Sequence, residues 1–488
     1  MHTRELRPPA PTIGRSRIGL LVLLCIAQLM VILDISAVNV ALPDLSRDLS
    51  IGQGSLEWTI TSYSLLFGSL LLLGGRAADL LGRRRTFMTG LAVFTGASLA
   101  AALAPSAGAL YAARAGQGIG AALLSPAALS IITTTFASGR ERAMALGVWG
   151  AIGGAGAAVG VLLGGVLTDL IDWRAIFFIN VPIGALLATT LVRLVPAEAT
   201  RPRWRGLDLR GALVATASLA ALLYAIADAD EVGWTAAQTL GLGGAALAGL
   251  GAFVALERRT VRPLLRIERL ADRAVAGGWA LMLLASAVLM SSFLLASVYL
   301  QDVLGGSPLE TGLEFLPIAL AVGAGAHAGG HLVQRLGVRA PMALAFGLAG
   351  LGALLLSSIE GTGSYLRDVL PGMLIAGVGL GIAMVSVAVA MLSGAREDDA
   401  GMLSGLNTTG HEVGGSLGVA ALTTIAAGAI DAGAGAPRHD ALAAGLGDAF
   451  LAAAGIAGAG LLLALLLLPA AGRFLPRLRQ APAAVSIH

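Results

Sequence analysis

Long apolar runs separated by short polar loops make up most of this chain of 488 residues. About fourteen such runs of about 20 residues can be counted, and each is long enough to cross the hydrocarbon core of a bilayer as a helix. The runs lack the short alternation of apolar and polar residues that outer-membrane barrels have, so all of them are expected to be helical. The pattern therefore predicts an all-α membrane protein.

The runs group along the chain as six, two and six. The predicted divisions are a cytoplasmic tail over 1–17, a six-helix bundle over 18–193, a linker with two accessory helices over 194–272, a second six-helix bundle over 273–470, and a cytoplasmic tail over 471–488. GRAADLLGRR at Gly75–Arg84 has an echo in GHLVQRLGVR at Gly330–Arg339, and each stretch follows the second run of its bundle. Repeated halves with a site between them are the usual plan of secondary transporters.

The two accessory helices are expected at about Leu213–Ile226 and Thr239–Leu256. Tyr224 is their only ionisable residue, so they are expected to have a supporting role.

Composition and charge agree with a membrane setting. Hydrophobic residues make up 56% of the chain and charged residues only 12%, about half the share in soluble domains. If the N-terminus is inside, the outside loops keep only four arginines, Arg47, Arg174, Arg367 and Arg438. The positive-inside rule then predicts both termini in the cytoplasm, in the inner (plasma) membrane. The excess of basic over acidic residues reflects this topology, and no nucleic-acid partner is expected.

Missing residue types exclude several classes of chemistry. The chain has no lysine, so it has neither a GxxxxGK[ST] phosphate loop nor a lysine Schiff base, and direct ATP hydrolysis is not expected. The single cysteine, Cys25, lies in the first apolar run, and His327 and His331 lack a third metal ligand. We expect no enzyme activity, no metal and no cofactor.

Two charges lie inside apolar runs. Asp34 is the only charge between Ile18 and Leu42, and Arg114 is the only arginine within a run. A charge at this depth costs roughly 2.5–3.5 kcal/mol on insertion scales, so such residues usually have a function and a partner. Asp34 and Arg114 are expected to pair, directly or through water, as a proton-exchanging site. The alternative is a static ion pair that joins two helices.

The loop stretch GRAADLLGRRR carries a second set of candidates. Gly75 and Gly82 suit a tight cytoplasmic turn, and Asp79 is close to the start of the next helix, where the helix dipole favours it. Arg83 begins the basic end of the motif. Topogenic charge alone is the alternative explanation.

The fifth run carries glycines at four-residue spacing, Gly156, Gly160 and Gly164, which would let a neighbouring helix approach closely. The thirteenth run contains NTTGHEVGGSLG, whose polar residues could form a second titratable cluster, or Glu412 could be neutral and only hydrogen-bonded. The candidates for the wall of a substrate cavity are polar residues of the apolar runs: Asn39, Gln117, Asn180, Asn407, His411 and Glu412.

Taken together, these motifs resemble the major facilitator superfamily, in its fourteen-helix drug:proton antiporter branch. The resemblance spans nearly the whole chain. The motifs that carry it are LDISAVNVALP, GRAADLLGRRR, RAGQGIGAA, WRAIFFINVPIG at Trp173–Gly184, YLQDVLGGSPLETG at Tyr299–Gly312, and the two-helix insertion.

The resemblance implies export of lipophilic drugs or antibiotics, cationic or neutral, by alternating access driven by protons. Asp34 would exchange the proton, Arg114 would be its coupling partner, and Asp79 and Arg83 would belong to a cytoplasmic latch. The expected partners are a small-molecule substrate, protons and the lipid bilayer, and the protein is expected to be a monomer.

Two departures from the family pattern stand out. Val161 replaces the proline of the fifth-helix motif GPxxGG, and His411-Glu412 replaces the usual Arg-Gln. The first keeps a symporter or uniporter for a metabolite open as an alternative. A membrane sensor or scaffold is less favoured, because it would need a sizeable soluble domain, and the longest polar stretches are loops of roughly twenty residues.

Overall fold

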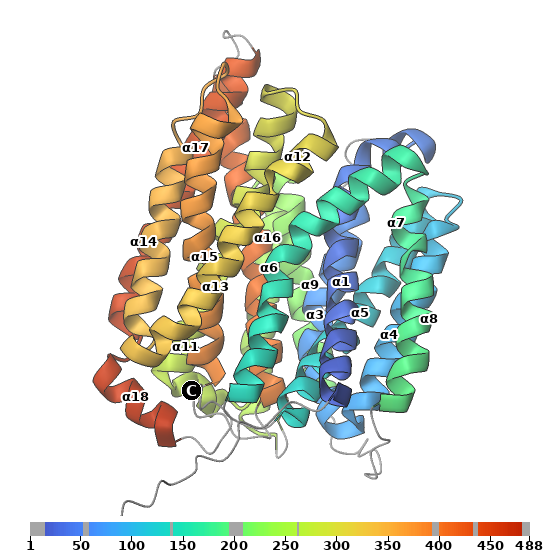
Figure 1. Ribbon diagram of the computed structural model, residues 1–488, viewed down its shortest axis with the longest axis vertical. Helices are drawn as coiled ribbons and strands as arrows, with labels where there is room; N and C mark the ends of the chain where they lie inside the picture. Colours follow the sequence, from blue (N-terminus) through green and yellow to red (C-terminus); the bar gives the residue numbers. More distant parts are fainter. Residues whose placement is uncertain are drawn as a thin grey trace, which may run out of the picture.

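The computed structural model describes residues 15–51, 58–136, 140–194, 208–260, 263–392, 400–432 and 438–480. These residues form helices and connecting turns, with no strand among them (Figure 1). Ten of the helices are long and apolar enough to cross a membrane. Four further long helices, α4, α6, α9 and α16, lie beside them in the bundle. The expected all-helical membrane fold is confirmed.

The N-terminal bundle is built from the first run of helices. Its members are α1 (Arg15–Asp48), α3 (Trp58–Leu81), α4 (Arg83–Ala102), α5 (Ala107–Thr135), α6 (Arg140–Leu170), the short α7 (Arg174–Phe178) and α8 (Asn180–Leu194). Helix α5 packs against both α3 and α4, α1 packs against α6, and α4 also contacts α8.

The C-terminal bundle repeats this packing. Its members are α11 (Arg273–Val298), η3 (Tyr299–Val303), α12 (Pro308–Glu314), α13 (Leu316–Leu336), α14 (Arg339–Leu356), η4 (Tyr365–Val369), α15 (Leu370–Leu392), α16 (Ala400–Ala432), α17 (Arg438–Leu467) and α18 (Ala471–Gln480). Helix α15 packs against α13 and α14 as α5 does against α3 and α4, α11 packs against α16 as α1 does against α6, and α14 contacts α17 as α4 contacts α8. The two halves therefore have the same internal plan.

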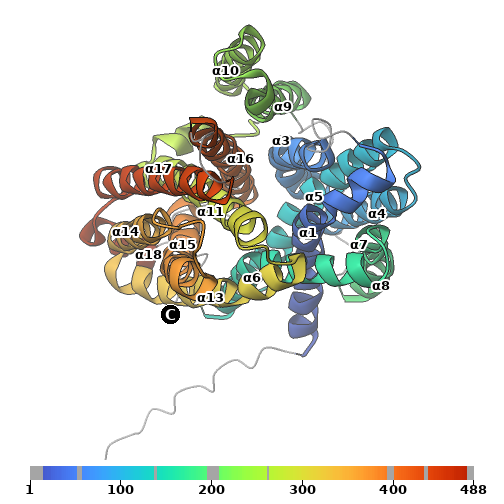
Figure 2. The ribbon, with the colours of Figure 1, turned by 90° about the horizontal axis from the view of Figure 1, so that it is seen from above.

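Two seams join the bundles. Helix α6 packs against α13, and α16 packs against α3, so each seam takes one helix from each half (Figure 2). The inserted hairpin of α9 (Leu209–Val232) and α10 (Ala237–Glu257) lies at the second seam, where α9 contacts both α3 and α16. Figure 2 shows α10 on the outside of this hairpin, away from both bundles.

The turn after α3 corrects one expectation. Gly75 lies within α3, where it is buried, so it does not form the turn predicted from the sequence. Gly82 makes the turn, with a φ of 105° that favours glycine. Its counterpart in the echoed motif, Gly337, has a φ of 71° at the turn between α13 and α14. Asp79 lies in the last turn of α3, and Arg83 begins α4.

Glycines let α6 approach α1 closely. A Cβ atom would lie 2.9 Å from Cγ2 of Ile32 at Gly156, 2.7 Å from Cβ of Ser36 at Gly160, and 2.7 Å from Cα of Ala37 at Gly164. Residues with a Cβ atom would clash with α1 at these three positions of α6. The close contact of α6 with α1, the helix that carries Asp34, therefore requires the GxxxGxxxG spacing.

Gly160→Leu is therefore expected to force α6 away from α1 and to destabilise the protein by about 1–3 kcal/mol, the usual cost of overpacking. Gly241→Leu is the matched control, because a Cβ at Gly241 meets no atom within 4 Å. The melting temperature of the purified protein in detergent should fall for Gly160→Leu and stay near the wild-type value for Gly241→Leu. Equal melting temperatures for the two variants would contradict the packing argument.

Candidate functional site

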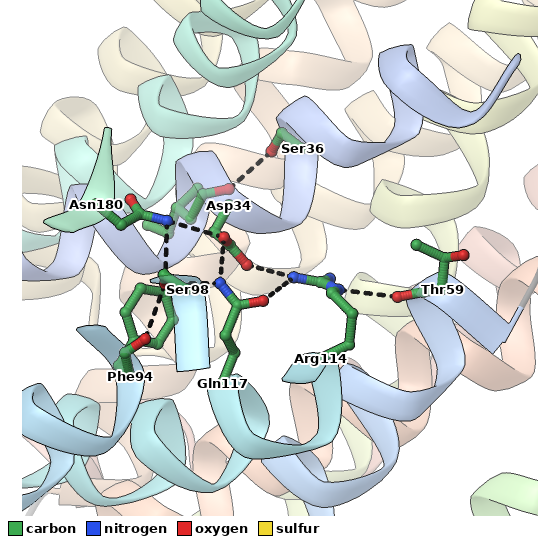
Figure 3. Close-up of polar contacts among 9 residues, drawn as sticks. Asp34, Ser36, Thr59, Phe94, Ser98, Arg114, Gln117 and Asn180 are labelled. Carbon is green, nitrogen blue, oxygen red and sulfur yellow. Dashed lines mark hydrogen bonds and ion pairs between the residues drawn. The ribbon is translucent and has the colours of Figure 1, made fainter. Parts of the chain in front are cut away.

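A buried ion pair lies in the middle of the N-terminal bundle (Figure 3). The Arg114 guanidinium, from α5, donates through Nη1 to Oδ2 of Asp34 on α1. Both residues are 1% exposed. The structure thus forms the pair expected from the two isolated charges in the sequence.

Amides complete the shell around the carboxylate. Oδ1 of Asp34 accepts a hydrogen bond from Nε2 of Gln117 at 2.7 Å and another from Nδ2 of Asn180 at 3.0 Å. The same two amide groups lie 2.8 and 3.4 Å from Oγ of Ser98, which itself donates to the carbonyl of Phe94 at 2.8 Å. Each carboxylate oxygen therefore has a donor in the absence of bulk water.

The guanidinium has its own set of acceptors. Nε of Arg114 donates to the Thr59 carbonyl at 2.8 Å, and Nη1 also donates to Oε1 of Gln117 at 2.9 Å. The cation lies 4.5 Å from the ring centre of Tyr63 and 5.8 Å from that of Phe177. Cation–π contacts of this kind stabilise a desolvated charge by about 2 kcal/mol.

The network spans five helices. Asp34 comes from α1, Thr59 from α3, Ser98 from α4, Arg114 and Gln117 from α5, and Asn180 from the start of α8. It is neutral overall, with one acid and one base. Groups from five helices of one bundle therefore meet at this ion pair.

Sequence reasoning found part of this shell. Asp34, Arg114, Gln117 and Asn180 were candidates and lie together, whereas Thr59, Tyr63, Ser98 and Phe177 were not candidates. Thr59 contributes a backbone carbonyl, for which the sequence holds no signal. Ser98 could have been noticed as a hydroxyl within an otherwise apolar helix. The side chains of Asn39 and Val161 lie outside the described part of the structure.

The polar residues of α16 separate into different environments. Nδ1 of His411 lies 2.6 Å from Oγ of Ser286 on α11, and the same hydroxyl donates to the His411 carbonyl at 2.7 Å. Both contacts join α16 to α11 inside the C-terminal bundle.

Glu412 faces the other way, toward the N-terminal bundle. A Cβ atom at Gly68 on α3 would lie 3.3 Å from Cβ of Glu412, so the acid packs on α3 at the seam between the bundles. His411 and Glu412 thus do not form one cluster. Oδ1 of Asn407, one turn earlier, is buried without a hydrogen-bond partner.

A second ion pair fixes the far end of α1. Nη1 of Arg174 lies 2.7 Å from Oδ2 of Asp48, and Nε1 of Trp173 donates to the same oxygen at 3.1 Å. The hydrogen bonds from Arg174 and then Trp173 lower the pKa of Asp48 below its usual value. This end of α1 is thereby held on α7.

Metal chemistry has no support in the described residues, where no group of three or more histidine, cysteine, aspartate or glutamate side chains converges. The buried polar centre instead pairs one acid, the Asp34 carboxylate, with the Arg114 cation.

Comparison with known proteins identifies relatives of this chain. The family model described as Major Facilitator Superfamily matches residues 24–419. The puromycin resistance protein of Streptomyces alboniger is 41% identical over 84% of this chain and 82% of its own length. The cephamycin export protein of Amycolatopsis lactamdurans is 39% identical over 93% of each chain. The multidrug resistance protein Stp of Mycobacterium tuberculosis is 34% identical over 85% of this chain and 76% of its own.

A solved structure agrees at the level of the fold. The human organic anion transporter MFSD10 superposes with a TM-score of 0.62 over 93% of this chain and all of its own, at 17% identity. With a family match across most of the sequence and relatives above 30% identity, the chain belongs to the major facilitator superfamily, as its motifs predicted.

Proposed function

We propose that this transporter exports small-molecule antibiotics or other drugs in exchange for protons, with Asp34 as the proton-exchanging group. The names of its relatives support the substrate class, since they include puromycin and lincomycin resistance proteins and a cephamycin export protein. The single observation that carries the coupling is the buried Asp34–Arg114 pair within its amide shell.

The proton acts through the ion pair. When Asp34 is ionised, its attraction for Arg114 holds α1 against α5. A proton that arrives from outside neutralises the carboxylate and removes this attraction. Arg114 keeps its bonds to the Thr59 carbonyl and to Gln117, and its ring contacts, so the cation stays solvated by the protein while α1 is released.

Both seams lie within reach of this change. Helix α1 packs through the glycine face on α6, which contacts α12 and α13 of the other half. Helix α3, which supplies Thr59 and Tyr63, contacts α16 of the other half. Movement of α1 relative to α5 would therefore bear on α6 and α3, which both contact the other half, as α5 itself does through α16. Rocking of the halves about these seams exposes the substrate to one side and then to the other.

The driving force is sufficient. One proton that moves inward down the membrane potential supplies about 2.3 kcal/mol per 100 mV, before any pH difference is added. We propose one proton per drug molecule, a monomeric protein of the plasma membrane, and both termini in the cytoplasm.

Asp34→Asn tests the coupling. The amide keeps the acceptor for Gln117 and Asn180 but carries no exchangeable charge, so proton-driven drug uptake into inverted vesicles should fall to background while the protein still folds. A panel of puromycin, lincomycin, a cephamycin and tetracenomycin C in a sensitive host first selects the drug for the assay. Asp44→Asn, the same change on an exposed acid of α1 paired with Arg47, should transport normally. Full activity of Asp34→Asn would remove Asp34 from the mechanism.

Arg114→Ala is expected to abolish the dependence of drug transport on a pH difference and to destabilise the protein, by about 3–5 kcal/mol, because it leaves a buried charge unpaired. The double variant Asp34→Asn/Arg114→Ala removes both charges and should recover much of the stability but none of the coupling. Drug flux and melting temperature measured on the two variants separate these effects. An unchanged pH dependence in Arg114→Ala would count against the proposal.

Glu412→Gln probes the substrate class. Because Glu412 places a carboxyl group at the seam between the halves, we propose that it attracts cationic drugs. The variant should lower resistance to cationic compounds several-fold and leave resistance to neutral ones unchanged. Glu310→Gln, a change on an exposed acid at the start of α12, is the control for loss of charge. An equal loss for both compound classes would contradict the assignment.

A further inference from the structure

A cavity of about 640 Å³ lies at one end of the C-terminal bundle, far from Asp34 along the helices. Ten residues line it: Ala271, Asp272, Arg273, Arg339, Leu466, Leu467, Leu468, Pro469, Ala470 and Arg473. They come from the end of the 3-10 helix η2 (Ile267–Ala271), the starts of α11 and α14, the end of α17, the turn that follows it, and α18. Its volume is within the range of roughly 300–1,000 Å³ that small-molecule sites occupy.

Three arginines give this cavity its charge. Arg273, Arg339 and Arg473 form no ion pair within the described part of the chain. The one acid in the lining, Asp272, accepts a hydrogen bond from the backbone N–H of Ala274 at 2.9 Å and so caps α11. The lining therefore carries a net charge of +2. Guanidinium groups bind phosphate oxygens in pairs, which makes a phosphate group the matching ligand.

The echoed loop motif shows that Arg339 departs from its counterpart. In the alignment of GRAADLLGRR with GHLVQRLGVR, Arg84 corresponds to Arg339. Arg84 uses its Nη2 to donate to the Val192 carbonyl at the end of α8, at 3.2 Å. The equivalent helix end in the other half is that of α17, yet Arg339 faces the cavity there and makes no such bond. Helix α14 also starts without a side-chain cap, so its N-terminal end adds to the positive potential.

The position of the cavity at the ends of candidate membrane spans places it near the expected boundary between hydrocarbon and headgroups. Three membrane-crossing segments end at it: Arg273–Val303, Arg339–Leu356 and His439–Leu467. On its apolar side, Leu466 is 73% exposed and Leu467 is 36% exposed at the end of α17, where acyl chains would lie. Arginines over an apolar wall at this height suit a lipid with a charged headgroup.

The short helix α18 lies beside the cavity and contributes Arg473 to its lining. It carries Arg473, Arg477 and Arg479 and no acid, and Phe474, at 1% exposed, anchors it in the bundle. Figure 1 shows α18 at the end of the C-terminal bundle, lying across the direction of the long helices. A basic helix in this position lies along the membrane surface, where anionic lipid is concentrated.

We propose that this cavity binds the phosphate headgroup of an anionic phospholipid, with Arg273, Arg339 and Arg473 as its ligands. Under the proposed topology, the lipid comes from the cytoplasmic leaflet. It links the first residues of α11 and α14 to α18, and so supports the outer packing of the C-terminal bundle. The site goes beyond drug export and does not depend on Asp34.

Lipid binding to the purified full-length protein tests this site. Native mass spectrometry after delipidation, with phosphatidylglycerol or zwitterionic phosphatidylethanolamine added back, gives the number of bound lipids and their affinity. We expect one tightly held phosphatidylglycerol and no comparable phosphatidylethanolamine. Arg273→Gln/Arg339→Gln should weaken that binding by about tenfold or more, since hydrogen bonds to charged groups are strong.

Arg193→Gln is the matched control, because it removes one exposed charge from the end of α8, away from the cavity. Its lipid affinity should equal that of wild type, and all variants should share the wild-type circular dichroism spectrum. Retained lipid binding in the double variant, or an equal loss in Arg193→Gln, would overturn the proposal. Displacement of the lipid by millimolar inorganic phosphate alone would also overturn it, because the site would then hold a soluble phosphate compound. None of these readouts requires transport, so failure of the export proposal leaves this test intact.

Discussion

The burial of one carboxylate beside one guanidinium is the constraint on which the N-terminal bundle depends. Neither charge could remain in an apolar interior without polar partners, because each would then cost several kcal/mol. The protein meets this cost with a full set of partners: two amides on Asp34, a backbone carbonyl and an aromatic face on Arg114. The five helices that supply these groups must keep their positions for the pair to persist.

The packing of α6 and α3 connects the ion pair to the C-terminal bundle. Helix α6 approaches α1 through glycines, and α3 carries both the Thr59 carbonyl and the ring of Tyr63. These two helices also meet the C-terminal bundle, at α13 and α16, and α5, which carries Arg114, contacts α16 as well. The ion pair therefore lies on helices that touch the seams directly or through one neighbouring helix. The two seams are related by the repeat. Helix α6 corresponds to α16 and α3 corresponds to α13, so the contact of α6 with α13 is matched by the contact of α16 with α3.

Much of the fold was predictable because membrane helices have long apolar sequences. A charged residue within such a sequence is easy to recognise. Asp34 and Arg114 could be paired in advance for that reason, and Gln117 and Asn180 were recognisable as amides in apolar helices. Ser98 and Tyr63 were not, since hydroxyl and aromatic residues are common in such helices and only their packing gives them a role. Gly75 and Gly82 illustrate a different limit: glycine serves turns and close helix contacts equally, and only the backbone angles separate the two uses. His411 and Glu412 are neighbours in sequence, but successive residues on a helix point about 100° apart, so each faces a different helix.

The central claim is that Asp34 changes its protonation as the transporter works. Infrared difference spectroscopy on the purified protein in lipid, between acidic and alkaline buffer, observes this change at the carboxyl group itself. The account predicts a carbonyl band of a protonated carboxylic acid that appears at low pH, that shifts in heavy water, and that is missing when Asp34 is replaced by asparagine. A spectrum in which no carboxyl band of the wild type depends on Asp34 at any pH the protein tolerates would contradict it.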